Sequence, residues 1–492
     1  MLLLTAAATL PYQGALMNSI RRTVRFANSS LLFFALAIPV VAQQKKLPGP
    51  PARQRRATQS ATFHVPRIAF QTRTLPNGLR IVMAEDHHVP VVNLQVWYHV
   101  GSKDEKPGHT GFAHMFEHLM FKGSAHVGPD EHSRIIEAMG GFDNAYTNDD
   151  VTVFWETFPS NGLSRVLWLE ADRMGSLAVD ENNFTSERQV VEEERRRGVD
   201  NSPYGRIQED LYAAAFTVHP YHHTTIGSMA DLDKATVEEV RAFHDTYYRP
   251  NNATLVIVGD FNPAQTAEWA QKYFGGIPRS PSPIPRVTAK EPPQTAERTV
   301  TKSYPGVPLP AVVEGYKMPA RFALESYPLD LASNILAGGE SSLLYQSLVY
   351  KQRIAAAAAG FGNFTEDPNL FWVYAIMSPG HTAQEGEKAL DAVLADVKKS
   401  GVSSSDLQKA KNQEISTEIL GRETDQEKAG ALGEAAVIGK NPDLVNTDLA
   451  KYEAVTTAAI QHAADLYFNQ KHETVLFYLP QTQAKPANGS SK

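Results

Sequence analysis

The stretch TVEEVRAFHDTYYRPNNATLVIVGD, residues 236–260, aligns without a gap on TTAAIQHAADLYFNQKHETVLFYLP, residues 456–480, at an offset of 220 residues. In both copies apolar residues with helical spacing lead into an apolar strand. The alignment pairs Asp245 with Asp465, and similar strand and helix patterns occur in similar order before each copy. A chance match of generic helix-then-strand patterning is the alternative, and this shared order argues against it. The repeat therefore predicts two related halves.

A boundary between the halves is indicated by residues 277–297, which are rich in Pro and Ser and show no periodicity. We predict an N-terminal domain over residues 67–277, an interdomain linker over 278–297 and a C-terminal domain over 298–482. A disordered tail is predicted for residues 483–492. In the N-terminal domain, apolar strands joined by an Asn-Gly turn are followed by helical patterns, so each domain combines a sheet with helices.

The N-terminus has the pattern of an export signal. Three arginines form a positive patch there: Arg21, Arg22 and Arg25. An apolar run at residues 31–42 follows and ends in the small-residue site Val-Val-Ala, which predicts a signal peptide over residues 1–42. Residues 43–66 are then a linker. The run is too short to span a bilayer comfortably. The alternative is an uncleaved amphipathic anchor, but the following segment to about Ser60 is rich in Pro, Gln and Arg and has the composition of a linker. We therefore expect an exported protein, periplasmic or secreted, without stable membrane insertion.

The composition narrows the function further. The 492 residues are 42% hydrophobic and 21% charged, as in ordinary globular proteins, and this excludes a disordered or multi-span membrane protein as the main interpretation. The net charge of −7 gives no basic surplus to bind phosphates, so no nucleic-acid partner is expected. The chain contains no cysteine. Any metal site must therefore be built from His, Asp or Glu.

Such a site is indicated by the run GFAHMFEHLMFKG at residues 111–123, which contains His114, Glu117 and His118 in the pattern H-x-x-E-H. On a helix the two histidines, four residues apart, share a face and can bind one ion, while Glu117 lies beside them as a base. Alternatively these groups are bonded to backbone in a polar helix. That explanation fits poorly, because the flanking residues are apolar and polar groups among them are costly unless satisfied.

A third ligand is expected from residues 181–216, which have the pattern of a long helix. Glu187, Val190, Val191 and Glu194 fall on one stripe of it, and the valines should turn this stripe inward. We therefore predict Glu194 as the metal ligand and Glu187 as a group that supports the site from behind the ligands. The remaining charged residues are predicted to form a solvated face: Glu192, Glu193, Arg195, Arg196 and Arg197. A solvated face could also account for the whole cluster.

HMFEH, with Glu194 lying 76 residues after His118 inside an E-R-x-V-V-x-x-E run, resembles the inverted zinc motif of the insulinase and pitrilysin family. The two-half layout is similar to the mitochondrial-processing-peptidase-like bacterial members. The resemblance implies one Zn²⁺ per chain on His114, His118 and Glu194, with Glu117 as the general base that activates a zinc-bound water. It also implies an α+β fold of two homologous α/β-roll domains, each a mostly antiparallel sheet packed with helices, enclosing a chamber.

The segment at residues 144–158 has a strand-like pattern, and its first part matches the family's strand beside the zinc. In the family a substrate peptide adds to this strand as an extra strand, which makes Asn144 and Ala145 candidate substrate-binding residues. An ordinary buried sheet strand is the competing explanation.

One departure from the family concerns the second domain, where members typically carry an Arg and a Tyr, seven residues apart, that reach the zinc site. Here Val349 and Ala356 occupy those positions, Leu343 replaces an earlier Arg, and neither Val349 nor Ala356 can donate a hydrogen bond from its side chain. We therefore hypothesise that this chain is the zinc-bearing half of a heterodimer and that a homologous partner subunit supplies both groups. A homodimer is the alternative assembly. A shift of Arg353 into the role is a weaker alternative.

The favoured function is a zinc metalloendopeptidase that hydrolyses peptides or unfolded polypeptide segments. The alternative is a non-catalytic structural or peptide-binding subunit that uses the same chamber without turnover. The tract HPYHH at residues 219–223 could be a second metal site, although histidines beside Pro in a loop are more often surface or substrate-path residues.

Overall fold

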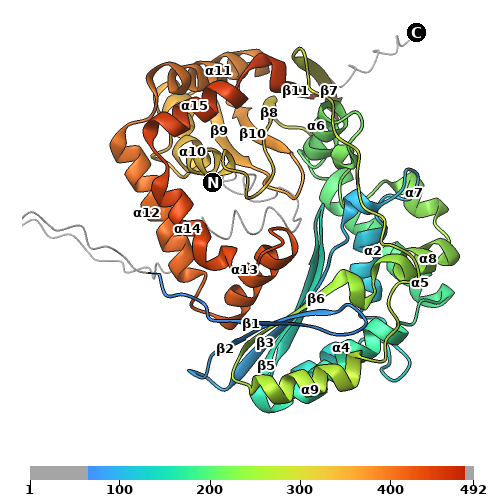
Figure 1. Cartoon of the computed structure of the whole chain (residues 1–492). Coiled ribbons are helices and arrows are strands. Elements are labelled where there is room, and N and C mark those ends of the chain that lie inside the picture. Colours follow the sequence, from blue (N-terminus) through green and yellow to red (C-terminus); the bar gives the residue numbers. More distant parts are fainter. Residues whose placement is uncertain (1–64, 482–492) are drawn as a thin grey trace, which may run out of the picture.

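The computed structural model describes residues 65–481, which build two sheets with helices packed around each of them (Figure 1). The mixed helix-and-sheet class predicted from the sequence is confirmed. The predicted signal peptide, most of the linker at residues 43–66, and the predicted tail lie outside the described residues. Among the described residues, no helix combines the length and apolar character needed to cross a bilayer.

The first sheet has the strand order β1-β2-β6-β3-β5-β4. Its strands are β1 (Gln71–Thr74), β2 (Arg80–Glu85), β3 (Val91–Tyr98), β4 (Phe142–Thr147), β5 (Thr152–Pro159) and β6 (Ala253–Gly259). All neighbours are antiparallel except β2 and β6. The predicted strand at residues 144–158 is a hairpin of β4 and β5, because Asn148 closes a turn. Its N–H donates to the carbonyl of Val151, and its side chain accepts from two backbone N–H groups of the turn.

The second sheet has the order β7-β11-β8-β10-β9. Its strands are β7 (Arg298–Tyr304), β8 (Ala311–Lys317), β9 (Ala355–Gly362), β10 (Leu370–Met377) and β11 (Glu473–Pro480). Here β11 lies between parallel β7 and antiparallel β8, just as β6 lies between parallel β2 and antiparallel β3. The helix α8 (Val237–Tyr247) precedes β6, and α15 (Thr457–Tyr467) precedes β11. The predicted repeat is therefore present as two equivalent helix–strand units.

The remaining helices divide between the halves. Those before the Pro-rich segment are α2 (Phe112–Leu119), α3 (Glu131–Ala138), α4 (Leu163–Ser176), α5 (Glu181–Arg195), α6 (Ile207–Ala215), α7 (Met229–Lys234) and α9 (Pro263–Phe274). Those after it are α10 (Ser326–Ala337), α11 (Ala383–Ser400), α12 (Ser404–Leu420), α13 (Asp425–Val437) and α14 (Leu444–Ala454). The long helix predicted over residues 181–216 is interrupted: α5 ends at Arg195, a π-helical turn follows at Arg196–Asp200, and α6 begins only at Ile207.

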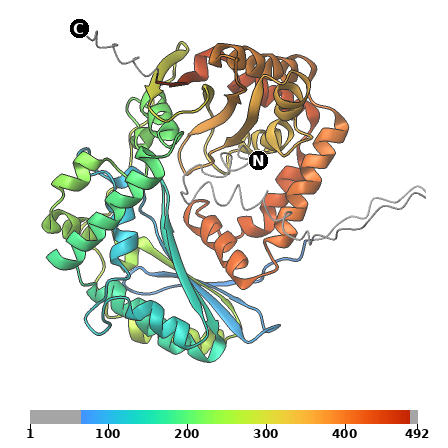
Figure 2. The ribbon, with the colours of Figure 1, turned by 180° about the vertical axis from the view of Figure 1, so that it is seen from behind.

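Each sheet is covered on one face by a helix from the other half (Figures 1 and 2). Leu432 and Ala436 of α13 pack into the same buried cluster as Val256 and Val258 of the first sheet. Conversely, α6 packs against β7, β8 and β11 and contributes Leu211 and Tyr212 to a core of the second sheet. Because burial of these apolar faces supplies much of the stabilising free energy, the two halves stabilise each other.

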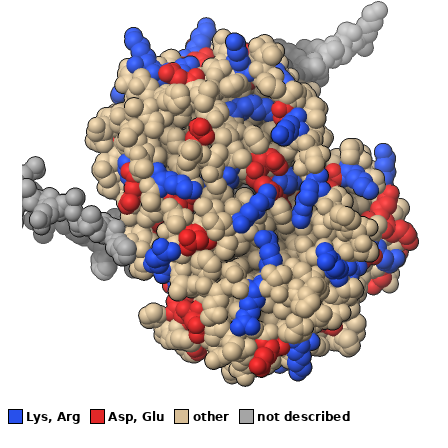
Figure 3. All heavy atoms as spheres, in the orientation of Figure 1, with Lys and Arg blue, Asp and Glu red and all other residues tan. Residues whose placement is uncertain are grey.

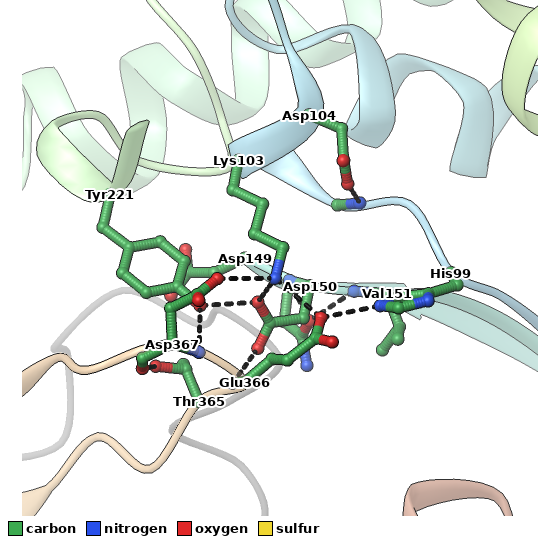
Figure 4. A network of polar contacts seen from close by, with 12 residues as sticks. His99, Lys103, Asp104, Asp149, Asp150, Val151, Tyr221, Thr365, Glu366 and Asp367 are labelled. Carbon is green, nitrogen blue, oxygen red and sulfur yellow. Dashed lines mark hydrogen bonds and ion pairs between the residues drawn. The ribbon is translucent and has the colours of Figure 1, made fainter. Parts of the chain in front are cut away.

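A buried charge network also joins the halves, at the loop between β9 and β10 (Figure 4). Lys103 Nζ lies 2.8 Å from Asp150 Oδ1, 2.7 Å from Glu366 Oε2 and 3.0 Å from Asp367 Oδ2. His99 Nε2 lies 2.7 Å from the same oxygen of Glu366. A cavity of about 440 Å³ adjoins this network and is lined by residues of both halves. None of the predicted site residues lines it.

Candidate metal centre

Helix α2 presents His114 and His118 on one face. The helix starts at Phe112 because Gly111 has a left-handed φ of 97°, and its apolar side, including Phe116 and Leu119, is buried in the core of the first half. Packing of that side turns the two imidazoles away from the core. Their ring centroids are 4.9 Å apart and their planes are nearly perpendicular. Two ring nitrogens can therefore face one point in space.

Helix α5 brings the predicted third ligand to the same place. Glu194 Oε2 lies 3.7 Å from His114 Nε2 and 3.5 Å from His118 Nε2. These separations are longer than good hydrogen bonds. They are close to the spacing of about 3.4 Å between two ligands of one tetrahedral zinc at bond lengths of about 2.1 Å. The three residues form one of the His and carboxylate groups within 4.8 Å that could hold an ion, so their donor set and spacing fit zinc.

Glu187 lies behind this group. Its Oε2 is 3.5 Å from His118 Nδ1, the nitrogen on the far side of the ring from Glu194, and its Oε1 is 3.3 Å from Lys122 Nζ. The Glu187 side chain is only 4% exposed. A buried carboxylate at the outer nitrogen of a histidine fixes the orientation of the ring and makes the other nitrogen a better ligand. This is the position in which a supporting role was predicted.

Burial and neighbouring charges shift the pKa of each group in this site. Burial, together with the neighbouring His118, lowers the pKa of His114 to about 4, so His114 is neutral at pH 7. Burial also lowers the pKa of His118, but hydrogen bonding to Glu187 and Glu194 and their negative charges outweigh it and raise the value to about 9. Although burial opposes it, the pKa of Glu194 is lowered by His118 and His114.

Glu117 lies on the same helix, between the metal-binding group and the edge of the first sheet. Burial raises the pKa of its carboxyl group, while hydrogen bonding to Thr147 at the end of β4 lowers it, and the net shift is upward. A carboxylate with a raised pKa holds and releases a proton closer to neutrality than an exposed one does. The arrangement thus places a proton-exchanging group beside the two histidines and the carboxylate of Glu194.

Strand β4 is the edge strand of the first sheet, and no further strand pairs with it among residues 65–481. Asn144 is exposed and Ala145 is half-buried. The N–H of Ala145 donates to the side-chain Oδ1 of Asn144 at 2.8 Å. The candidate substrate-binding residues therefore lie on an unpaired sheet edge, where the side chain of Asn144 accepts a hydrogen bond from the backbone N–H of Ala145.

The predicted charge distribution of α5 is partly wrong. Val190, expected to face inward, is 41% exposed, and the side chain of Glu194 is 45% exposed at the rim of the site. Arg195, expected to be solvated, is buried, where it pairs with Glu209 and donates to the carbonyl of Gly227. Glu192, also expected at the solvated face, is buried as well. The break after α5 lets α6 fold back and supply Glu209, which a single-helix periodicity does not anticipate.

The residues at the family's Arg and Tyr positions lie in the second half. Val349 belongs to the π-helical segment Tyr345–Lys351 and packs against the core there, whereas Ala356 is an exposed residue of β9. Arg353 is exposed, with φ at 59°, and makes no hydrogen bond or ion pair within residues 65–481. Within those residues, the histidines of the HPYHH tract do not converge on a metal-binding arrangement either.

A second His and carboxylate group, missed by the sequence reasoning, consists of His132, Glu156 and Glu170. It already contains a cation: Arg173 Nη2 lies 3.0 Å from Glu156 Oε1 and 2.5 Å from Glu170 Oε1. The guanidinium also stacks 4.6 Å from the ring of Phe154. Because arginine supplies the positive charge, this cluster is a buried structural network.

Two family models match the chain. Residues 80–228 match "Insulinase (Peptidase family M16)", and residues 234–414 match "Peptidase M16 inactive domain". The zinc protease PqqE of Helicobacter pylori is 33% identical over 426 residues, which cover 86% of this chain and 95% of that protein. This chain belongs to peptidase family M16. The predicted family is thus confirmed. The segment that matches the first M16 model contains all five residues of the candidate centre: His114, Glu117, His118, Glu187 and Glu194.

Other M16 proteins share the architecture. The crystal structure of a protease from Helicobacter pylori superposes with a TM-score of 0.81 at 32% identity, covering 84% of this chain and all of that one. The probable β subunit of the mitochondrial-processing peptidase of Arabidopsis thaliana is 24% identical over 409 residues, which cover 81% of this chain and 76% of that subunit. The chain therefore spans most of the length of its M16 relatives.

Proposed function

We propose that this M16 protein is a zinc-dependent endopeptidase that cleaves peptides or unfolded polypeptide segments. The observation that carries the proposal is the convergence of His114 Nε2, His118 Nε2 and Glu194 Oε2. These residues would hold the zinc, with one ion per chain. When bound, zinc would act as a Lewis acid that polarises the scissile carbonyl and lowers the pKa of a bound water.

Glu117 is the general base in this proposal. Its buried carboxylate accepts a proton from the attacking water and later delivers that proton to the leaving amine. The raised pKa supports both steps, because the protonated form is easier to reach than in an exposed glutamate. No side chain is required as a nucleophile, and the mechanism needs no covalent intermediate.

The substrate is proposed to add to β4 as a further antiparallel or parallel strand. The exposed edge supports this, since an extended peptide can use the backbone groups that no other strand pairs. The side chain of Asn144 must then release the N–H of Ala145, which becomes a donor for the peptide. Specificity would come from the side chains flanking that edge.

We further propose that a different but homologous subunit completes the site in a heterodimer, because a second copy of this chain would carry the same Val349 and Ala356. Val349 and Ala356 lack side-chain donors at the positions where the family carries Arg and Tyr, so this chain does not supply those groups there. The match of residues 234–414 to an M16 domain described as inactive is consistent with this, because all the candidate metal ligands lie before it.

The test is a comparison of wild type with Glu117→Gln, using zinc analysis and a peptide-library assay. The variant should retain one zinc per chain and lose roughly 10²- to 10⁴-fold in kcat/KM. Glu137→Gln is the matched control, because Glu137 is an exposed glutamate on the neighbouring helix α3. Equal cleavage by Glu117→Gln would refute the assigned base. Robust hydrolysis by the purified chain without any partner would refute the need for a homologous subunit.

A further inference from the structure

Several carboxylates gather between the second sheet and α11, far along the chain from the M16 metal centre. Glu314 of β8 projects from the same strand face as Val312 and Tyr316, both of which lie in the core beneath α11. Glu473 begins β11, the strand next to β8. Asp391 comes from α11, which covers this face of the sheet (Figure 1). The three carboxylates therefore come from three different elements.

One oxygen from each of the three lies within 4.8 Å of one oxygen from each of the others. Calcium binds oxygen ligands at about 2.4 Å, so two oxygens on the same ion can be at most about 4.8 Å apart. A single ion could thus contact all three carboxylates without a rearrangement of the strands. All donors are oxygens, which is the ligand set of hard divalent cations.

The unsatisfied hydrogen-bonding capacity of Glu314 points independently to a missing ligand. Glu314 is fully buried, and its Oε1 has no hydrogen-bond partner. The hydroxyl of Tyr316 lies 3.0 Å from Glu314 Oε2 and 3.0 Å from Glu473 Oε1, but it has one proton and can serve only one of them. A buried carboxylate in this condition costs free energy unless a further positive group satisfies it.

Among residues 65–481, no basic side chain forms an ion pair with these carboxylates, although Lys398 lies near enough for its charge to oppose the rise in the pKa of Asp391 that burial causes. Within residues 65–481, no Lys, Arg or His nitrogen lies within 4.0 Å of a carboxylate oxygen of Glu314, Asp391 or Glu473. Lys398, on the same helix as Asp391, donates instead to the carbonyl of Phe468. Two more acids, Glu297 and Glu387, are near enough to oppose the ionisation of Glu473. In the group of His132, Glu156 and Glu170, by contrast, the guanidinium of Arg173 balances the negative charge of the acids.

We propose that Glu314, Asp391 and Glu473 bind one hard divalent cation of the Ca²⁺ class. Glu314 and Glu473 provide buried ligands, and the exposed Asp391 leaves one side of the ion open to water. The absence of a histidine ligand separates this site from the zinc centre. Bound there, the cation ties α11 to β8 and β11 and stabilises the second half.

The competing arrangement is a proton shared among the acids, since burial raises the pKa of Glu314 and that of Glu473, the latter to about 7. A shared proton predicts stability that depends on pH and not on calcium. The two arrangements are therefore separated by adding the ion at a mildly alkaline pH, where the proton is lost most readily.

The test is calorimetric titration of the zinc-loaded full-length protein with Ca²⁺, together with thermal unfolding with and without Ca²⁺. Wild type should bind one Ca²⁺ per chain and unfold at a higher temperature in its presence. Asp391→Asn should weaken Ca²⁺ binding by at least about tenfold, because one of three anionic ligands is neutralised. Asp396→Asn, an exposed acid on the same helix outside the cluster, should bind Ca²⁺ as wild type does.

The double variant Glu314→Gln with Glu473→Gln should lose Ca²⁺ binding and the Ca²⁺-dependent shift in Tm. Because Asp391 is exposed, Asp391→Asn keeps the proposal falsifiable even where the double variant does not fold. Absence of Ca²⁺ binding by wild type, or equal binding by Asp391→Asn, would overturn the proposal. A Tm that responds to pH but not to Ca²⁺ would overturn it in favour of the shared proton.

Discussion

Lys103 Nζ in the first half lies 2.7 Å from Glu366 Oε2 in the second, although 263 residues separate them along the chain. The Lys103 side chain is 5% exposed, and its charge is balanced by Asp150 and Asp367 as well. The loop that carries Glu366 is held further by its own backbone N–H, which donates to Asp150 Oδ2 at 2.8 Å. One lysine thus fixes the position of a loop from the other half.

Replacing Lys103 with Met should destabilise the protein by about 3–5 kcal/mol, because buried carboxylates lose their counter-charge. Urea unfolding of wild type and variant measures this difference in the free energy of unfolding. Lys106→Met is the matched control, since Lys106 is exposed in the same loop, and its effect should stay within about 0.5 kcal/mol. A loss for Lys103→Met no larger than for the control would show that the network contributes little.

The contact of α13 with the first sheet depends on a glycine. A Cβ atom on Gly433 would lie 2.1 Å from Cε2 of Trp97, whereas a Cβ atom on Gly430 would meet nothing within 4 Å. Gly433→Ala should therefore destabilise by about 1–3 kcal/mol through overpacking. Gly430→Ala, on the same helix, should stabilise by up to about 1 kcal/mol through helix propensity. Equal changes in the urea midpoint for the two variants would contradict this packing.

Removal of the acidic ligand should weaken zinc binding. Glu194→Gln should lower zinc affinity by more than about 100-fold, and Glu187→Gln by about 10- to 100-fold, the range typical of groups that orient a ligand. Titration of the zinc-loaded protein with a competing chelator measures both. Glu193→Gln, next to Glu194 on the exposed surface, should bind zinc as wild type does. Wild-type zinc affinity in Glu194→Gln would exclude Glu194 as a ligand.

Asp149 gives a pH dependence of stability. Burial, reinforced by the neighbouring Asp150, raises its pKa to about 7 in the folded protein, against about 3.9 in the unfolded chain. The folded state then binds more protons between these values, so wild-type stability falls as pH rises from about 4 to about 7. Asp149→Asn should not lose this stability. As pH rises through that window, the free energy of unfolding of the variant should therefore increase relative to that of wild type, by up to about 1.4 kcal/mol per pH unit. Urea unfolding at several pH values tests this, and a constant difference would contradict it.

Some features were predictable because their signals are local. Each copy of the helix–strand repeat, the Asn-Gly turn and the H-x-x-E-H helix lies within about 25 contiguous residues, where periodicity and turn chemistry act directly. The grouping of Glu194 with the two histidines was predicted from the Glu187–Glu194 stripe of α5, although Val190 of that stripe is exposed and Glu194 lies at the rim of the site. His114, His118 and Glu194 were accordingly placed together from the sequence.

Other features depend on chain reversals that no local pattern encodes. Arg195 is buried because α6 folds back and offers Glu209, whereas Val190 of the predicted inward stripe is 41% exposed. The packing of neighbouring elements, which the periodicity of α5 does not encode, decides which of its residues are covered. Glu366, far along the chain, gives no sign in the sequence of its pairing with Lys103. The sequence also gives no sign that α13 packs against the first sheet, because the contacting residues are far apart in the chain and are brought together only by the fold.

The packing of α13 against the first sheet bears on how the protein is made. All six strands of that sheet have been synthesised once the ribosome passes Gly259, but α13 begins only at Asp425, about 170 residues later. At translation rates of about 5–20 residues per second, Val256, Val258 and their neighbours remain without the packing of α13 for roughly 10–30 seconds. During that interval the nascent chain exposes an apolar sheet face, to which a holding chaperone can bind until α13, in about the last seventh of the chain, has been made.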